Sequence, residues 1–155
     1  SECDVASGAG LYLSRQQLRD LTKFNFELGN HTYTHANCRT LSAAEFDGEI
    51  ERNKAVLEKI SDTRVRSFSV PYGSSLDLTT DLAQYLERSG YKAAFLAEGR
   101  ANSTGTHKFL LDRISVKAST DSAFFSEIEI LPRLRRIRTR ALAGSNSDSP
   151  PHVQL

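Results

Sequence analysis

Glu27-Leu-Gly-Asn-His31-Thr-Tyr-Thr-His35 is the stretch of this sequence from which most can be inferred. A short apolar run leads into a Gly-Asn breaker, and two histidines follow, four residues apart. Imidazole nitrogens held close together at the end of a rigid element are ligands for a divalent metal such as zinc. The spacing alone is a weak signal, because surface helices also produce it by chance. A second stretch downstream, Ser67-Phe-Ser-Val-Pro71-Tyr72-Gly73, adds weight to it.

Around these stretches the apolar periodicity predicts helices that alternate with strands. Capping boxes, in which a serine and the residue three positions later bond each other's backbone N–H, begin helices at Ser14 and Ser42. The helices are predicted over 14–24, 42–60, 79–88 and from 121 or 122 onward, and the strands over 26–28, 64–70, 91–96 and 109–116. Gly90 is expected to cap the third helix, and Pro132 to kink or split the fourth.

Strands alternating with helices are typical of a parallel sheet with helical crossovers, so the predicted fold class is α/β. In such folds the active site forms at the carboxyl ends of the strands. His31 and His35 follow the strand predicted at 26–28. Pro71 ends the strand predicted at 64–70, because proline cannot donate a hydrogen bond to a central ladder. Both stretches are therefore expected at strand ends of the kind that carry active sites.

Composition sets broad limits on the function. The chain has 155 residues, of which 39% are hydrophobic and 25% charged, as expected of one soluble globular domain. Its formal net charge of +1 gives no general reason to expect nucleic acid or a membrane surface as partner. No run of about 18 apolar residues is present, so no membrane span is expected. We predict a domain over 1–141 and a disordered tail over 142–155, where serine, asparagine, proline and glycine prevail.

The two cysteines, Cys3 and Cys38, do not form a disulfide framework, although one bridge between them is compatible with the sequence. Cys38 follows His35 by three residues, so a third metal ligand is one interpretation. The other interpretation is a small, half-buried residue at the start of a loop. For His31 and His35 the alternative to metal ligation is a pair of hydrogen-bonded histidines that cap a turn.

The segment from about residue 11 to 116 resembles the polysaccharide deacetylase family, the NodB-homology group of carbohydrate esterases. The resemblance rests on the stretches at 27–35 and 67–73, and on Ser89-Gly-Tyr-Lys-Ala-Ala-Phe95 and Leu111-Asp-Arg-Ile114 further on. It implies a distorted (β/α) barrel that binds one divalent metal, here expected to be zinc. It also implies removal of acetyl groups from N- or O-acetylated polysaccharide, and a place in the cell envelope or outside the cell.

Carried over residue by residue, the resemblance makes His31 and His35 metal ligands. The backbone N–H of Tyr72 would bind the oxyanion, Pro71 would position the turn, and Tyr72 and Gly73 would line the acetyl pocket. Arg113 is a further catalytic candidate, from its place at the end of the last strand, although a surface salt bridge is an equal alternative. His107 is a general-acid candidate without the flanking pattern that the family shows.

The sequence also departs from the family pattern. The family's Thr-Phe-Asp-Asp-Gly motif, which supplies the general base and the third metal ligand, has no counterpart before His31. Many members carry arginine where this chain has Ser69, which bears on the substrate. We therefore expect a fragment, a partial barrel that lacks its first strand or strands and is inactive, or nearly so, alone. Two rival hypotheses are a non-catalytic carbohydrate-binding or scaffold relative, and a structural zinc site built from both histidines and Cys38.

Overall fold

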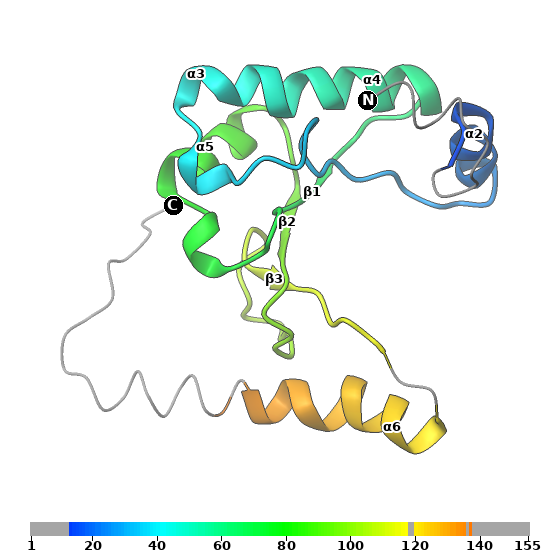
Figure 1. Ribbon diagram of the computed structural model, residues 1–155, viewed down its shortest axis with the longest axis vertical. Coiled ribbons are helices and arrows are strands. Elements are labelled where there is room, and N and C mark those ends of the chain that lie inside the picture. The colour runs from blue at the N-terminus through cyan, green and yellow to red at the C-terminus, as the bar shows by residue number, and fades with distance from the viewer. Residues whose placement is uncertain (1–12, 118–119, 136, 138–155) are drawn as a thin grey trace.

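The structure alternates helices with short parallel strands, as the sequence predicts. The computed structural model describes residues 13–117, 120–135 and 137 (Figure 1). In chain order its elements are α2 (Arg15–Lys23), the 3₁₀ turn η1 (Cys38–Thr40), α3 (Ala43–Phe46), the π-helical segment η2 (Asp47–Glu51), α4 (Arg52–Ser61), β1 (Ser67–Ser69), the 3₁₀ turn η3 (Ser75–Asp77), α5 (Thr80–Arg88), β2 (Ala93–Leu96), β3 (Leu111–Asp112), α6 (Asp121–Phe125) and the π-helical segment η4 (Ser126–Ile130).

The three strands form one parallel sheet in the order β1-β2-β3. Ser67 is in register with Ala93, and Phe95 with Leu111. Helix α5 makes the crossover from β1 to β2, so the predicted parallel sheet with a helical crossover is confirmed. The partial barrel expected from the resemblance stays a prediction.

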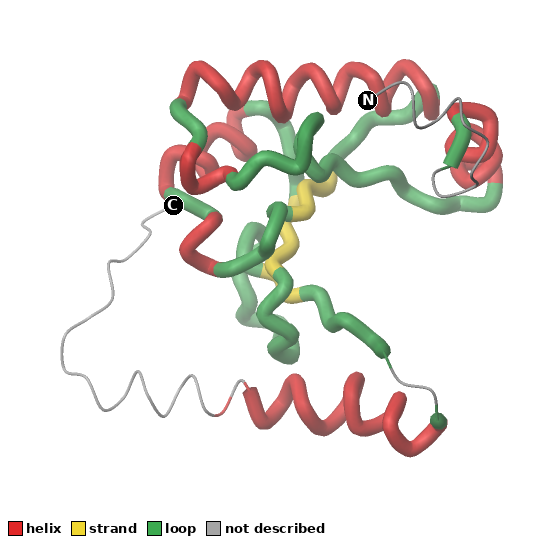
Figure 2. The backbone as a smooth tube through the Cα atoms, viewed as in Figure 1, coloured by secondary structure: helices red, strands yellow, loops and turns green. Residues whose placement is uncertain are grey.

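One face of the sheet carries the hydrophobic core. Figure 2 shows the continuous helix α3–η2–α4 and helix α5 on the same side of the strands. Apolar side chains of these helices pack against those of β1 and β2, because alternate strand residues point to one face. The fully buried members are Phe46, Ile50, Leu82, Leu86, Phe68, Val70, Ala94 and Leu96.

Local helix signals are confirmed where the sequence placed them. Both capping boxes form: Ser14 with Gln17 at α2, and Ser42 with Glu45 at α3. Gly90 follows α5 with a φ of 82°, a conformation that glycine adopts without a steric penalty.

The strands are shorter than predicted, and the one expected at 26–28 is absent. There, Asn30 alone makes a parallel bridge to Phe68, while Phe26 is 61% exposed. The segment has a ladder partner on one side only and no packing over its aromatic side chain, so nothing fixes a regular pleat. Among the described residues the last strand likewise shrinks from 109–116 to β3, where Leu111 and Asp112 alone find ladder partners in β2.

The last described helix, which begins with α6, lies apart from the core. In Figure 1 it lies beyond the β3 edge of the sheet, whereas α4 lies on the β1 side. It remains helical through Pro132, so the expected split does not occur; the π-helical segment η4 ends at Ile130, two residues before this proline. Hydrogen bonds to the body run from Ala101 N to Pro132 O, at 3.1 Å, and from Arg135 Nη1 to Gly99 O, at 3.4 Å. None of the described helices is long and apolar enough to cross a membrane. The tail predicted over 142–155 lies outside the described residues.

Candidate functional site

The turn that carries both histidines begins where the chain leaves the sheet. Asn30 N donates to Ser67 O and Ser69 N donates to Asn30 O, so the turn starts beside β1. Thr32 and His35 have φ angles of 63° and 61°, in the left-handed region. This conformation is uncommon for a residue with a side chain and rarer still for a β-branched one, so other contacts must hold the turn.

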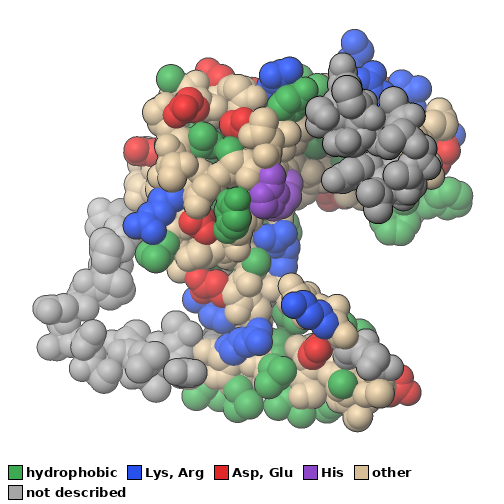
Figure 3. Space-filling view, in the orientation of Figure 1, with side chains coloured by type: hydrophobic (Ala, Val, Ile, Leu, Met, Phe, Trp, Pro, Cys, Tyr) green, Lys and Arg blue, Asp and Glu red, His purple; other side chains and the backbone are tan. Residues whose placement is uncertain are grey.

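The two imidazoles converge at the end of β1. The ring centroids of His31 and His35 are 4.8 Å apart, with the rings edge to face. The His35 ring in turn lies 5.1 Å from the Tyr72 ring. His31 is half-buried and His35 is exposed. Figure 3 shows histidine side chains at the surface, at the edge of a hollow in this face of the molecule. The two stretches singled out in the sequence therefore meet.

The protonation of His31 is set by its surroundings. Its Nδ1 lies 2.6 Å from the carbonyl oxygen of Ser69, which can only accept, so Nδ1 carries the proton. Burial is the main cause that lowers the pKa of His31, and the charges of His35 and Arg113 lower it further, whereas the Ser69 carbonyl raises it. The favoured form is a neutral ring whose Nε2 lone pair is available as a ligand atom.

The second stretch forms a strained turn at the end of β1. Pro71 is buried, whereas the Tyr72 side chain is 66% exposed with a φ of 64°. Gly73 has a φ of 72°, and an added Cβ would lie 2.5 Å from the Cβ of Ala97, so only glycine fits. Its carbonyl accepts a hydrogen bond from Ala97 N at 2.7 Å. Within the described part of the chain, the Tyr72 N–H has no hydrogen-bond acceptor and is free to donate to a ligand.

Arg113 lies beside this turn and joins the carboxyl ends of two strands. Its Nε donates to Leu96 O at 3.0 Å and its Nη2 to Val70 O at 3.1 Å. Val70 directly precedes Pro71, so the guanidinium charge is held next to the turn at 71–73. The surface salt bridge considered from the sequence is not formed with any described residue. A catalytic role for Arg113 stays a prediction.

Three polar residues that the sequence analysis did not single out as functional hold the histidine turn. Asn30 is fully buried, and its side chain binds Ile50 O, Tyr91 Oη and Thr32 N. Asn53 of α4 and Glu49 of η2 bond the turn from the helix that covers it. The available signal was the polar Asn53 in the middle of an otherwise apolar helix stripe.

Two weaker candidates are not part of the site. Cys38 is fully buried, its Sγ lies 3.9 Å from Ala36 O, and burial raises the pKa of its thiol to about 12. His107 lies at the other end of the sheet, since its neighbour Lys108 accepts a hydrogen bond from Ala94 at the start of β2. No group of three or more histidine, cysteine, aspartate or glutamate side chains able to hold a metal occurs within 13–117, 120–135 and 137. The structural zinc site predicted from the two histidines and Cys38 is therefore wrong.

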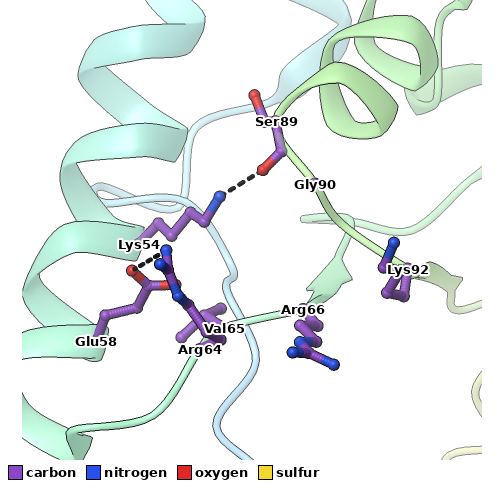
Figure 4. A pocket seen from close by; sticks show the side chains of 8 residues that line it. All are labelled: Lys54, Glu58, Arg64, Val65, Arg66, Ser89, Gly90 and Lys92. Carbon is purple, nitrogen blue, oxygen red and sulfur yellow. Dashed lines mark hydrogen bonds and ion pairs between the residues drawn. The ribbon is translucent and has the colours of Figure 1, made fainter.

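A separate cavity of about 260 Å³ opens at the amino ends of the strands (Figure 4). Lys92 N donates to Arg66 O there, just before β2 and β1 begin. The lining residues are Lys54, Glu58, Arg64, Val65, Arg66, Ser89, Gly90 and Lys92. Cationic side chains prevail and histidine is absent from the lining, so this cavity is distinct from the histidine turn.

Comparisons with known proteins agree on one group. The family model of polysaccharide deacetylases matches residues 6–104. A protein of Bacillus anthracis described as a polysaccharide deacetylase shares 21% identity with a TM-score of 0.64, over 78% of this chain and 38% of its own. The Streptococcus pyogenes deacetylase PplD, solved in complex with acetate, shares 18% identity with a TM-score of 0.68. The match covers 80% of this chain and 54% of PplD. A polysaccharide deacetylase of Bacillus cereus shares 19% identity with a TM-score of 0.62. The match covers 79% of this chain and 38% of the Bacillus cereus protein.

These likenesses concern the fold, because all three identities lie near one residue in five. The chain spans between about 38% and 54% of the length of these solved structures. A search of curated proteins gives no match.

Proposed function

Because the chain belongs to the polysaccharide deacetylase family, we propose that it contributes the metal-binding turn and the oxyanion turn of a carbohydrate deacetylase. The enzyme would be a metal-dependent hydrolase that removes acetyl groups from N- or O-acetylated polysaccharide. The observation that carries the proposal is the meeting of His31, His35 and Tyr72 at the carboxyl end of β1, with ring centroids 4.8 Å and 5.1 Å apart.

His31 and His35 are suited to serve as two ligands of a zinc ion. His31 is held in the tautomer that leaves Nε2 free, by a hydrogen bond from Nδ1–H to a backbone carbonyl. Metal-binding histidines commonly show this outer hydrogen bond. His35 offers a second, exposed imidazole beside it. The described residues supply no third ligand, so an aspartate from elsewhere is required.

When bound, a divalent cation would lower the pKa of a coordinated water and polarise the acetyl carbonyl. The chain's own residues would do the rest. The free N–H of Tyr72 would donate to the oxygen on which negative charge develops, and its left-handed backbone aims that donor before the substrate arrives. Pro71 fixes one backbone angle beside it. The Tyr72 ring and the Gly73 backbone would form a wall for the acetyl methyl group.

Zinc binding tests the first part of this proposal. The 155-residue chain should bind zinc weakly, and replacement of both histidines by alanine should abolish the binding measured by calorimetry. Acetate release tests the second part. The chain alone should release little acetate from acetylated chitin oligomers or acetylated xylan, because it presents two ligands and no base. Joining the family's Asp-Asp segment in front should produce activity; an extended chain of this kind that binds zinc yet is inert on all acetylated glycans contradicts the proposal.

A non-catalytic carbohydrate-binding or scaffold relative is the second candidate. The lack of a third acidic or histidine ligand among the described residues is the observation that favours it. Under this second candidate, the extended chain should be retained on acetylated glycan but release no acetate. Replacing both histidines should leave that retention unchanged.

A further inference from the structure

One face of the continuous helix α3–η2–α4 contacts the turn that carries His31 and His35, the histidine turn. Glu49, Arg52 and Asn53 lie three and four residues apart, so their side chains leave the helix on the same side. Each of them contacts a residue of the turn at 30–34. The helix thus holds the turn through several independent polar contacts, rather than by apolar packing alone.

Glu49 binds the outer part of the turn. Its Oε2 accepts from the backbone N–H of Tyr33 at 3.1 Å and of Thr34 at 2.9 Å. Its Oε1 accepts from Thr34 Oγ1 at 2.9 Å. A carboxylate that accepts two backbone N–H groups forms stronger hydrogen bonds than a neutral acceptor, because its charge assists them. Arg52 adds a stacking contact, with its Cζ 3.9 Å from the centre of the Tyr33 ring.

Asn53 binds the inner part of the turn. Its Nδ2 donates to Asn30 Oδ1 at 2.7 Å and to Thr32 O at 2.9 Å. Asn30 Oδ1 also accepts from Thr32 N at 3.0 Å, so the two amides and the Thr32 backbone form one network. The buried Asn30 is anchored in turn by its bond to Ile50 O at 2.8 Å. These bonds hold Thr32 in its left-handed conformation.

The conformation of this turn decides where the imidazoles point. His31 and His35 bracket the three residues that Glu49 and Asn53 bind, and His35 itself has a left-handed φ of 61°. Released from the helix, the turn would relax toward commoner backbone angles and the rings would separate. Outer contacts that orient metal ligands are worth about 10- to 100-fold in metal affinity.

We propose that Glu49 and Asn53 are positioning residues that hold His31 and His35 in register to share one divalent cation. This inference rests on the proposed function, because it assigns the purpose of the helix contacts to the metal. Neither side chain would hold the cation itself; both would act through the backbone of the turn between the two ligands.

The test compares Glu49→Ala and Asn53→Leu with the matched variant Glu58→Ala. Glu58 lies on the same helix and also accepts a backbone N–H, from Val65 at 3.0 Å, but far from the turn. Zinc affinity of the full chain is measured by competition with a chelating dye. Amide hydrogen exchange at Tyr33 and Thr34, and the proton–proton contact between the His31 and His35 rings, are followed by NMR without metal. Glu49→Gln is the conservative rescue, because its oxygen can accept from both amides while its NH₂ faces Thr34 Oγ1.

We expect Glu49→Ala and Asn53→Leu to weaken zinc binding about 10- to 100-fold, to speed exchange at residues 33 and 34, and to abolish the ring–ring contact. Glu58→Ala should change none of the three, and Glu49→Gln should recover most of the affinity. Unchanged zinc affinity alongside faster exchange overturns the positioning role and leaves the proposed function standing. If the wild-type chain takes up no zinc, the proposed function fails, and survival of the ring–ring contact in both variants then overturns the positioning role separately.

Discussion

The imidazole Nδ1 of His31 lies 2.6 Å from the carbonyl oxygen of Ser69, 38 positions later in the chain. Ser69 is the last residue of β1, so this hydrogen bond ties the histidine turn to the end of that strand, two residues before Pro71. The bond needs a proton on Nδ1 and leaves the Nε2 lone pair available. One contact thereby sets both the place and the protonation of the ring.

The first prediction concerns pH. Burial lowers the pKa of His31 below its ordinary value of 6.5, so the unfolded chain binds this proton more readily than the folded one. The resulting contribution to the free energy of unfolding is present above 6.5 and is lost as the pH falls through the lower folded value. The free energy of unfolding, measured in urea from about pH 8 to about pH 5, should fall more steeply for the wild type than for His31→Gln. Parallel curves for the two proteins would contradict the assignment.

The second prediction concerns the turn after β1. In Gly73→Ala the new methyl group meets both Ala97 Cβ, at 2.5 Å, and Ala97 N, at 2.6 Å, and φ is 72°. Gly90→Ala is the matched control, since φ is 82° there but no atom lies within 4 Å. The left-handed angle alone should cost Gly90→Ala about 1–2 kcal/mol of unfolding free energy. Gly73→Ala should lose about 1–3 kcal/mol more, because of overpacking. Equal losses, measured by urea unfolding, would mean that the close approach to Ala97 is absent.

The pattern of correct and incorrect predictions follows the range of the interactions involved. The capping boxes at Ser14 and Ser42 were predictable, because each is made within four residues. The meeting of His31 with the 71–73 turn was also expected, because parallel strands bring their carboxyl ends together. Strand lengths were not, since a strand at 26–28 needs a second neighbour and a packing layer, neither of which the local sequence reveals.

The residues that support the site escaped prediction for the same reason. Asn53 bonds Asn30 and Thr32 from 23 and 21 positions away, and Glu49 bonds Thr34 from 15. Their pairing depends on how the helix settles on the sheet. The break that Asn53 makes in an apolar stripe was visible, but its partner was not.

The third prediction tests the corrected strand at 26–28. Phe26 is 61% exposed, whereas Phe68 is fully buried between the sheet and its helices. Phe68→Ala should therefore lose about 3–5 kcal/mol of unfolding free energy. Phe26→Ala should change it by less than about 0.5 kcal/mol. A loss above about 2 kcal/mol in Phe26→Ala would instead restore the buried strand expected from sequence.

The fourth prediction separates the two-histidine site from one that includes Cys38. Burial raises the pKa of the Cys38 thiol to about 12, so the thiolate that zinc requires is not favoured there. Cys38→Ala should keep the zinc affinity of the wild type, and site-resolved alkylation should leave Cys38 unmodified in the folded chain and modified in urea. Loss of zinc binding in Cys38→Ala alone would re-establish the sulfur as a ligand.

The fifth prediction concerns Arg113, which donates to Leu96 O and Val70 O and so fastens two strand ends beside the site. Arg113→Met leaves the carbonyls of these two buried residues without this charged donor, a loss of about 1.5–3 kcal/mol in unfolding free energy. Because Val70 adjoins Pro71, the 71–73 turn should loosen and the NMR contact between the His35 and Tyr72 rings should weaken. Arg64→Met is the control: Arg64 is 79% exposed and lies 4.0 Å from Glu58, so its loss should cost less than about 0.5 kcal/mol. An intact ring contact in Arg113→Met would show that the turn keeps its shape without the guanidinium, which would leave Arg113 free to act on the substrate alone.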